Sequence, residues 1–382
     1  MTTEGGRWPG KRPQHRLLVG GSEGRISGYV LKVIRESIGQ TQEQLAERLG
    51  VSAATIQGWE SGRRPLMSVS TGNLMVLCAE LRRFGAAPAL LGALAQGLEA
   101  DLFVGDVLAT SHDQARSDGH RLGCWVVTRP FTEMTAWPIG GTAPHAVASS
   151  SRQALRHGPV PPGPAFGVDE RMHIVTHLQT VAERADRRTA EGLLLARQAY
   201  YLLGFDTSPE TMAWLAEMYR TDRQFVRPAP GWSPNWPLAR STASALTRLG
   251  DPEPMRRFIG DQLCDEAGER ANLNYWAFWV GDFAEQQTGD AFIGTTPLGA
   301  WHGNRLMRHL LDRLYGNIGF LELNIHTLWS LIRIRPEMIT DPLVAQEMAA
   351  KVERLLDENL VSAASRRELD ALRYAIAITR RY

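Results

Sequence analysis

The sequence has few cysteines and no long apolar run. Its three cysteines, Cys78, Cys124 and Cys264, are far apart in the 382 residues, and no Cys-x-x-Cys pair occurs. This spacing argues against a disulfide framework and against a structural zinc cage. Because no run of about 18 apolar residues occurs, no segment is expected to cross a membrane. The first residues also lack the apolar stretch of a secretory signal, so we expect a cytoplasmic protein.

A strong net charge is also missing. The formal net charge of the chain is +1, which predicts no general attraction to nucleic acid or to an anionic membrane. The charge is nevertheless uneven along the chain. Residues 1–85 contain 12 Lys and Arg against 7 Asp and Glu, whereas the remainder contains 30 against 34. The positive charge is therefore concentrated towards the N-terminal end.

The pattern of apolar residues divides the chain into four parts. With 43% hydrophobic and 22% charged residues, the composition is that of an ordinary soluble protein. We predict a disordered basic tail (1–24), a helix-turn-helix domain (25–85), a connector with short helices (86–167) and a helical domain (168–382). The basic residues of the tail either lie in a minor groove of DNA or are simply solvated. The predicted fold class is all-α.

The last of these parts contains about ten helical blocks. Helix starts are marked by the pairs Ser208-Pro209, Asp251-Pro252 and Asp341-Pro342, in which a capping residue precedes a proline at the first helical position. Blocks that recur at intervals of about 20 residues favour a TPR-like array or another α-solenoid. The blocks share no clear residue signature, so a helical bundle remains an alternative.

Residues 41–65 form the most informative segment, which reads as two short helices joined by a tight turn. Thr41 and Gln44 have the spacing of a capping box at the start of the first helix. Gly50 ends that helix, because glycine adopts the left-handed cap without strain. Ser52 then caps the second helix. Two short helices connected in this way form a helix-turn-helix.

The second helix has an outer face without acidic residues. This face consists of small or amide-bearing residues, namely Ala53, Ala54, Gln57 and Gly58. Such a face can enter the major groove of DNA, whereas phosphates would repel an acidic one. An alternative interpretation is that the two alanines only satisfy helix propensity.

These residues resemble the Xre family, the DNA-binding domain shared by Cro and the lambda-type phage repressors. The resemblance lies in the block Thr-Gln-x-x-Leu-Ala-x-x-Leu-Gly-Val-Ser and in Trp-Glu-x-Gly-Arg-Arg-x-Pro, and it covers residues 26–84. It implies a lambda-repressor-like fold and double-stranded DNA as partner. It also implies a homodimer, because one helix-turn-helix buries too little surface for high affinity.

The resemblance implies DNA contacts for eight residues of the motif. Gln42 would contact a phosphate, although a merely solvated side chain is the alternative. Ser52 and Thr55 would contact phosphate or sugar, and Arg63 and Arg64 would clamp the DNA backbone. The candidate base readers are Ala53 and Ala54, which can touch a thymine methyl group, and Gln57, which can pair with adenine. A further carboxylate in the motif, Glu60, is expected to bind within the domain.

Nothing in the sequence points to catalysis. No phosphate-binding Gly-x-x-x-x-Gly-Lys-Ser/Thr loop occurs. His173 and His177 are four residues apart and could share a metal, but the metalloprotease pattern fails and a structural or surface pair is the alternative. We therefore expect no enzyme, no cofactor and no metal.

The C-terminal part is rich in aromatic and amide side chains, which suit a ligand groove. The predicted effector-binding residues are Trp276, Trp279, Asn324 and Trp329, with core packing as the alternative. A helix-turn-helix followed by a helical array resembles the architecture of the peptide-sensing quorum regulators. We therefore expect a cytoplasmic, nucleoid-associated transcription regulator controlled by a peptide or small-molecule effector. The alternative is a DNA-anchored scaffold that binds another protein.

Overall fold

The computed structural model describes residues 24–151, 163–222, 232–283, 285–315, 318–358 and 360–379. All regular structure in these ranges is helical, and no strand occurs in them. The predicted all-α fold class is therefore confirmed. Residues 1–23, which make up nearly all of the predicted basic tail, lie outside the described residues. None of the helices in the described ranges is long and apolar enough to cross a membrane.

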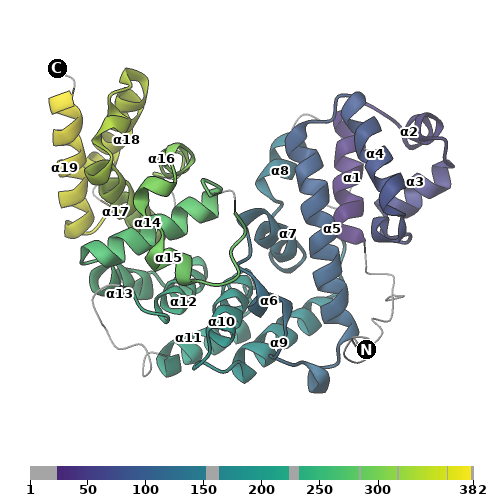
Figure 1. Cartoon of the computed structure of the whole chain (residues 1–382), viewed down its shortest axis with the longest axis horizontal. Coiled ribbons are helices and arrows are strands. Elements are labelled where there is room, and N and C mark those ends of the chain that lie inside the picture. The colour runs from purple at the N-terminus through teal and green to yellow at the C-terminus, as the bar shows by residue number, and fades with distance from the viewer. Residues whose placement is uncertain are drawn as a thin grey trace, which may run out of the picture. The chain divides into compact units, whose positions relative to one another are not determined.

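The chain divides into two compact units, residues 1–111 (unit 1) and residues 112–382 (unit 2) (Figure 1). The described part of unit 1 is a cluster of five α-helices and one short 3₁₀ helix. These are α1 (Arg25–Ser37), α2 (Gln42–Leu49), α3 (Ala53–Glu60), η1 (Leu66–Ser68), α4 (Thr71–Arg83) and α5 (Pro88–Ala109).

Helix α1 packs against both α3 and α5, and small residues allow the close approach. A Cβ atom on Gly28 of α1 would lie 2.2 Å from the carbonyl oxygen of Trp59 in α3. A Cβ atom on Gly97 of α5 would lie 3.1 Å from the Cα atom of Ser27. Both distances are shorter than ordinary packing allows, so larger residues would push the helices apart.

A carboxylate from α5 caps the start of α1. The two oxygens of Asp101 accept hydrogen bonds from the backbone N–H groups of Ile26 (2.9 Å) and Ser27 (2.8 Å). Gly24 at the N-cap of α1 has no side chain that could accept them. Asp101 therefore satisfies two donors that the first turn of a helix leaves without partners.

The first unit extends further than the domain predicted from the sequence. The sequence predicts a connector from residue 86, whereas in the structure residues 88–109 form α5, which packs along α1. The stretch is almost uncharged before Glu99, so it has no polar face from which its packing could be read. The predicted boundary at residue 85 thus falls inside unit 1.

Unit 2 continues as a series of helices. Its described elements are η2 (His112–Gln114), α6 (Arg121–Cys124), α7 (Arg129–Gly140), α8 (His145–Ser151), α9 (Val168–Arg184), α10 (Ala190–Leu203), α11 (Pro209–Asp222), α12 (Trp236–Arg248), α13 (Glu253–Gln262), α14 (Glu266–Val280), α15 (Ala291–Thr295), η3 (Leu298–Ala300), α16 (Asn304–Leu311), α17 (Ile318–Ile334), η4 (Pro336–Ile339), α18 (Pro342–Glu358) and α19 (Ala363–Thr379).

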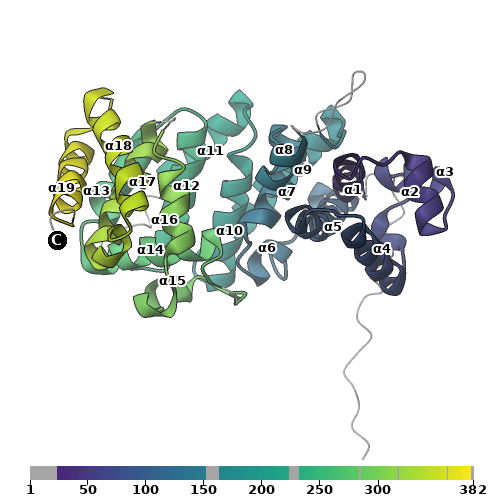
Figure 2. The same cartoon turned by 90° about the horizontal axis from the view of Figure 1, so that it is seen from above.

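These helices pack on one another in a row (Figure 2). Helix α9 packs on α10, α10 on α12, and α12 on α13; further along, α13 contacts α17, and α17 contacts α19. From residue 168 onward the regular structure of the described ranges is helical, as expected. Its TPR-like character stays a prediction.

Part of the predicted connector also belongs to unit 2. The buried amide of Gln198 in α10 donates to the carbonyl oxygen of Leu122 (2.6 Å) and accepts from the backbone N–H of Val127 (2.6 Å). The segment around α6 is thereby fixed to α10. Unit 2 accordingly begins well before residue 168.

Candidate nucleic-acid interface

Local capping chemistry sets the ends of the two motif helices. Thr41 accepts a hydrogen bond from the backbone N–H of Gln44 (3.2 Å), and the side chain of Gln44 accepts one from the backbone N–H of Thr41 (2.8 Å). Gly50 ends α2 in the left-handed conformation, with φ of 66°. The hydroxyl of Ser52 accepts from the backbone N–H of Thr55 (3.1 Å) at the start of α3. The predicted capping box, glycine turn and second cap are all confirmed.

The predicted base readers lie on the outer side of α3. Ala54 and Gln57 are exposed, and Ala53 is half-buried. Gly58 differs from the prediction, because it is buried under Arg64. A Cβ atom on Gly58 would lie 3.1 Å from the side chain of Arg64, so the glycine makes room for that side chain and does not face outward.

Arg63 and Arg64 are both exposed just beyond α3, but they are held differently. The backbone N–H of Arg64 donates to the carbonyl oxygen of Gly58 (2.9 Å), and its guanidinium donates to the hydroxyl of Thr55 (3.4 Å). Thr55 in turn shares a hydrogen bond with Ser52 (2.9 Å). Arg64 therefore places positive charge at the start of the recognition helix.

Glu60 is buried and links three helices. Its carboxylate accepts hydrogen bonds from Nε (2.5 Å) and from a terminal nitrogen (3.1 Å) of Arg35 in α1. It also accepts one from the amide nitrogen of Gln42 at the start of α2 (2.7 Å). The expectation that Glu60 binds within the domain agrees with these contacts. Nothing in the linear sequence pairs it with Arg35, which lies 25 residues away.

The contact with Glu60 bears on the role predicted for Gln42. An amide nitrogen carries two protons, and Glu60 accepts one of them. The second proton is left for an acceptor outside the domain. The structure thus places Gln42 in a fixed orientation at the first turn of α2, where helix N-termini favour phosphate.

A family described as a helix-turn-helix domain matches residues 28–97. The match spans α2, α3 and α4 and reaches into α5. The chain contains a helix-turn-helix domain. No curated protein and no solved structure matches the chain. The family match covers the helix-turn-helix motif and does not extend into unit 2.

The predicted effector residues of unit 2 lie on two helices and differ in burial. Trp276 and Trp279 lie on α14, the first buried and the second half-buried. Asn324 of α17 is buried, and its amide donates to the carbonyl oxygen of Arg313 (3.2 Å). Trp329 instead lines a separate cavity of about 370 Å³ between α17 and α19. The effector-binding role of these four residues stays a prediction.

Two buried amides of α14 are structural. Asn274 is fully buried; its amide donates to the carbonyl oxygens of Ile293 and Thr296 and accepts from Nε1 of Trp301 (each 2.9 Å). Asn272 is fully buried as well and donates to Thr327. These side chains hold α14 to its neighbours, so the core interpretation applies to them.

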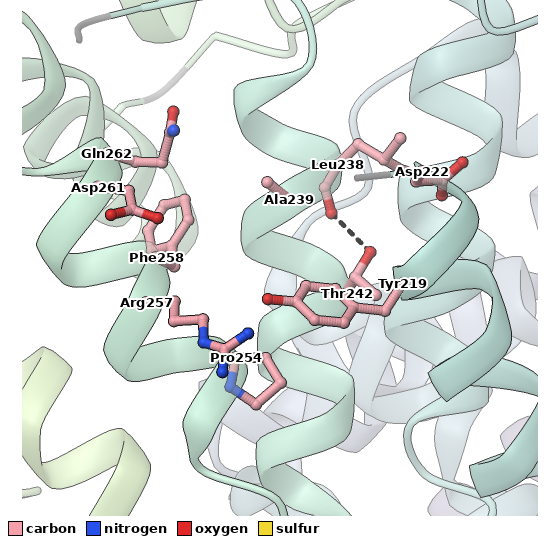
Figure 3. Close-up of a pocket in the computed structure, with 10 residues that line it drawn as sticks. All are labelled: Tyr219, Asp222, Leu238, Ala239, Thr242, Pro254, Arg257, Phe258, Asp261 and Gln262. Carbon is pink, nitrogen blue, oxygen red and sulfur yellow. Dashed lines mark hydrogen bonds between the residues drawn. The ribbon is translucent and has the colours of Figure 1, made fainter. Parts of the chain in front are cut away.

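The structure contains a cavity that the sequence did not indicate. It has a volume of about 110 Å³ and lies between α11, α12 and α13 (Figure 3). Leu238 and Phe258 form an apolar surface in it, and Asp222, Arg257 and Asp261 add charged groups. Residues from three separate helices meet there, which explains why no local pattern marks the cavity.

The two histidines considered as a metal pair point to different partners. Nε2 of His177 lies 3.4 Å from Nε2 of His120, whereas the ring of His173 packs on that of His112 at 4.4 Å. Burial lowers the pKa of both His120 and His177 to about 4, so both rings are neutral at pH 7. Across the described ranges, no three ligating side chains gather in a way that could hold a metal.

Proposed function

We propose that this chain is a sequence-specific transcription regulator of the Xre type, which binds duplex DNA with α3 in the major groove. The observation that carries the proposal is the exposed face of α3. Ala54 and Gln57 lie on it without any acidic neighbour on the helix, because Glu60 is turned inward to Arg35. A helix with such a face can approach the base edges without repelling the phosphates.

The surrounding residues supply contacts to the DNA backbone. Arg63 and Arg64 provide two guanidinium groups beyond the end of α3, and Gln42 provides an amide proton at the start of α2. Ser52 and Thr55 add hydroxyl groups at the start of α3. These contacts would set the position of the helix, while Gln57, Ala53 and Ala54 would read bases.

The regulator is proposed to act as a homodimer. Residues 168–382 would provide the dimer contacts, and two features of this region support that role. Leu343 of α18 and Tyr374 of α19 are large apolar side chains that are 76% and 70% exposed, and a second copy would cover them. A symmetric dimer would place the two recognition helices about 34 Å, or a multiple of it, apart, so its operator would be an inverted repeat.

We further propose that an effector bound in unit 2 controls operator affinity. An effector can do so only by binding two arrangements of the dimer with different affinity, and typical coupling is about 1–3 kcal/mol. The alternative is a DNA-anchored scaffold without a small effector. A small molecule or peptide that copurifies with the chain favours the regulator, and a stable stoichiometric protein partner favours the scaffold. No catalytic role is proposed.

Selection from a random pool of duplex DNA tests the proposed function. The full chain is expected to enrich one motif with two inverted half-sites. In the Gln57→Ala variant, preference at one base position in each half-site should weaken by about 1–3 kcal/mol while the rest of the motif is kept. Failure to enrich any motif, or enrichment of single-stranded DNA, would contradict the proposal.

A further inference from the structure

Arg240 of α12 is a buried cation without an anionic partner. The residue is only 3% exposed, and its guanidinium lies 3.9 Å from the ring centroid of Tyr275 and 4.9 Å from that of Trp276. In the described part of the chain no carboxylate forms an ion pair with Arg240; its guanidinium shares a side-chain hydrogen bond with Tyr275, and its Nε makes none. Burial lowers the pKa of Arg240, which shows that its charge is poorly solvated. Buried charges in proteins are normally paired, so this one needs an explanation.

Two further polar groups beside Arg240 lack acceptors. Nε1 of Trp276 is buried without a hydrogen bond, and so is Nε2 of His309. The rings of Trp276 and His309 are 5.1 Å apart. Nδ1 of His309 lies 3.2 Å from a guanidinium nitrogen of Arg129. Because that nitrogen can only donate, Nδ1 must accept and Nε2 must carry the proton.

The three nitrogens without an acceptor, Nε of Arg240, Nε1 of Trp276 and Nε2 of His309, are therefore all donors. Arg240, Trp276 and His309 each present an N–H, and an anion is the ligand that satisfies several donors at once. Burial, together with Arg313 and Arg129, lowers the pKa of His309 to about 3, so the ring is a neutral donor at pH 7. Water could satisfy individual groups, but it would not balance the buried charge.

The charge around this cluster is positive. Three further arginines lie in or beside it. Arg129 and Arg313 lower the pKa of His309, and Arg197 acts on Tyr275. The facing carboxylates are already engaged: Glu133 accepts from Arg129 (2.6 Å), and Asp290 accepts from Arg197. Within the described residues Arg240 and Arg313 form no ion pair, although Glu133 attracts Arg313 from a distance, and this excess of positive charge favours a bound anion.

Half-buried aromatic side chains border the cluster. Trp279 packs on Tyr201 at 5.2 Å and stacks on Tyr275 at 6.4 Å between ring centroids. Such rings offer an apolar surface beside the cationic group. We propose that this cationic–aromatic cluster of unit 2, centred on Arg240, binds a small aromatic carboxylate, with its carboxylate on the three donors and its ring against the aromatic side chains.

This inference deepens the proposed effector control and rests on it only for the consequence at the operator. Ligand binding can be measured on the full chain without DNA. A failure of ligand binding is thus distinguishable from a failure of DNA recognition.

The first experiment compares two probes of the same shape. Benzoate and its neutral amide, benzamide, are added separately to the full chain at equal ionic strength, and thermal unfolding is followed. Benzoate is expected to raise the unfolding temperature with increasing concentration, because a ligand of the folded state stabilises it. Benzamide and inorganic phosphate should have no such effect. Equal shifts with benzoate and benzamide, no shift with benzoate, or a shift with phosphate alone would each overturn the proposal.

The second experiment locates the site. The Arg240→Met variant keeps most of the side-chain volume but removes the charge. It is expected to bind benzoate at least ~10-fold more weakly, while the unliganded variant unfolds at the same temperature as the original chain or higher. The control is Arg373→Met, which removes an exposed arginine paired with Asp370 on α19 and should leave the benzoate response unchanged.

A third variant covers the case in which Arg240→Met does not fold. Arg313→Met removes an arginine at the exposed edge of the cluster, which makes no ion pair or side-chain hydrogen bond with the rest of the described chain. Its benzoate affinity should fall severalfold. Full benzoate binding by both folded variants, or by Arg313→Met when it alone folds, would overturn the assignment of the site.

Discussion

At the scale of single residues, Glu60 ties the recognition helix α3 to two other helices of unit 1. The carboxylate is buried, and it joins α3 to Arg35 of α1 and to Gln42 of α2. Breaking a buried ion pair from one side leaves the other charge without a partner, which typically costs about 3–5 kcal/mol. The same pair also orients the amide proposed to contact DNA, so stability and binding depend on one group.

The Glu60→Gln variant tests this role. Unit 1 should lose about 3–5 kcal/mol of unfolding free energy, because Arg35 stays buried without a charge partner. Urea unfolding of the full chain measures the loss, with Glu80→Gln as control for an exposed ion pair. Replacing both partners, Arg35→Met with Glu60→Leu, should restore much of the stability. A loss below about 0.5 kcal/mol in Glu60→Gln, the level of an exposed pair, would show that the pair does not hold α3.

The two arginines beyond α3 differ in a measurable way. Arg63 is exposed and makes no side-chain hydrogen bond or ion pair with the rest of the described chain, whereas Arg64 covers Gly58 and bonds to Thr55. Arg63→Ala should reduce the slope of log affinity against log salt by about 0.9 without changing the unfolding temperature. Arg64→Ala should reduce the slope and lower the unfolding temperature as well. An unchanged slope in either variant would remove that arginine from the DNA interface.

At the scale of elements, the start of α1 depends on a residue 75 positions later in the sequence. Asp101 of α5 accepts from the backbone of Ile26 and Ser27, both of which are fully buried. Burial raises the pKa of Asp101 to about 6, although the hydrogen bonds from Ser27 and Ile26 oppose the shift. Because the folded pKa lies above the unfolded one, the contribution of this group to stability decreases as pH rises from about 4 to 6.

The Asp101→Ala variant should be less stable by about 1–3 kcal/mol at pH 7, because two buried N–H groups lose their acceptor. The difference should grow as pH falls from about 6 to 4, where the original chain regains the stability that ionisation removes. Chemical unfolding across this pH range measures both effects. A constant difference between the two proteins would contradict the assigned titration.

The pair formed by His120, at the N-cap of α6, and His177 of α9 predicts the opposite pH dependence in unit 2. His120 and His177 face each other, and burial lowers the pKa of both to about 4. The unfolded chain takes up these protons near pH 6.5, so stability is full above that pH and is lost as pH falls towards 4. His177→Gln should flatten this acid dependence, and His302→Gln, at an exposed position, should not. Equal acid sensitivity of both variants would exclude the histidine pair as the cause of the loss of stability at low pH.

Structural features that depend on neighbouring residues could be predicted from the sequence, whereas contacts between distant segments could not. Thr41, Gly50 and Ser52 act on backbone groups within a few residues, so the motif helices could be bounded from the sequence alone. The pairing of Arg35 with Glu60 and the cap from Asp101 join distant segments, and no spacing rule indicates them. The sequence pattern predicts Gly58 on the outer face of α3, and this is wrong. Arg64 covers Gly58, and because Arg64 follows the end of the helix, the pattern within α3 does not show this contact.

At the scale of the whole molecule, the helices of unit 2 could be predicted from the sequence. The cavity and the cationic–aromatic cluster between those helices could not. Capping residues or apolar stripes mark several helices of unit 2, and these signals are local. The cavity of Figure 3 and the cluster around Arg240 each combine side chains from several helices. Tryptophans and asparagines in the sequence suggested a groove, yet several of them are core residues in the structure. Aromatic content alone does not separate core from ligand site.

The central claim is that the outer face of α3 enters DNA, and a matched pair of charge substitutions tests it most directly. Ala54 of α3 and Ala79 of α4 are both exposed helical alanines of unit 1. Ala54→Glu and Ala79→Glu therefore add the same charge at similar structural cost. Affinity for the selected operator is measured for both variants at one salt concentration. We predict that Ala54→Glu weakens binding at least ~100-fold, because the new carboxylate would be desolvated against base edges and phosphates, while Ala79→Glu changes it by less than ~10-fold. Equal affinities of the two folded variants would contradict the account.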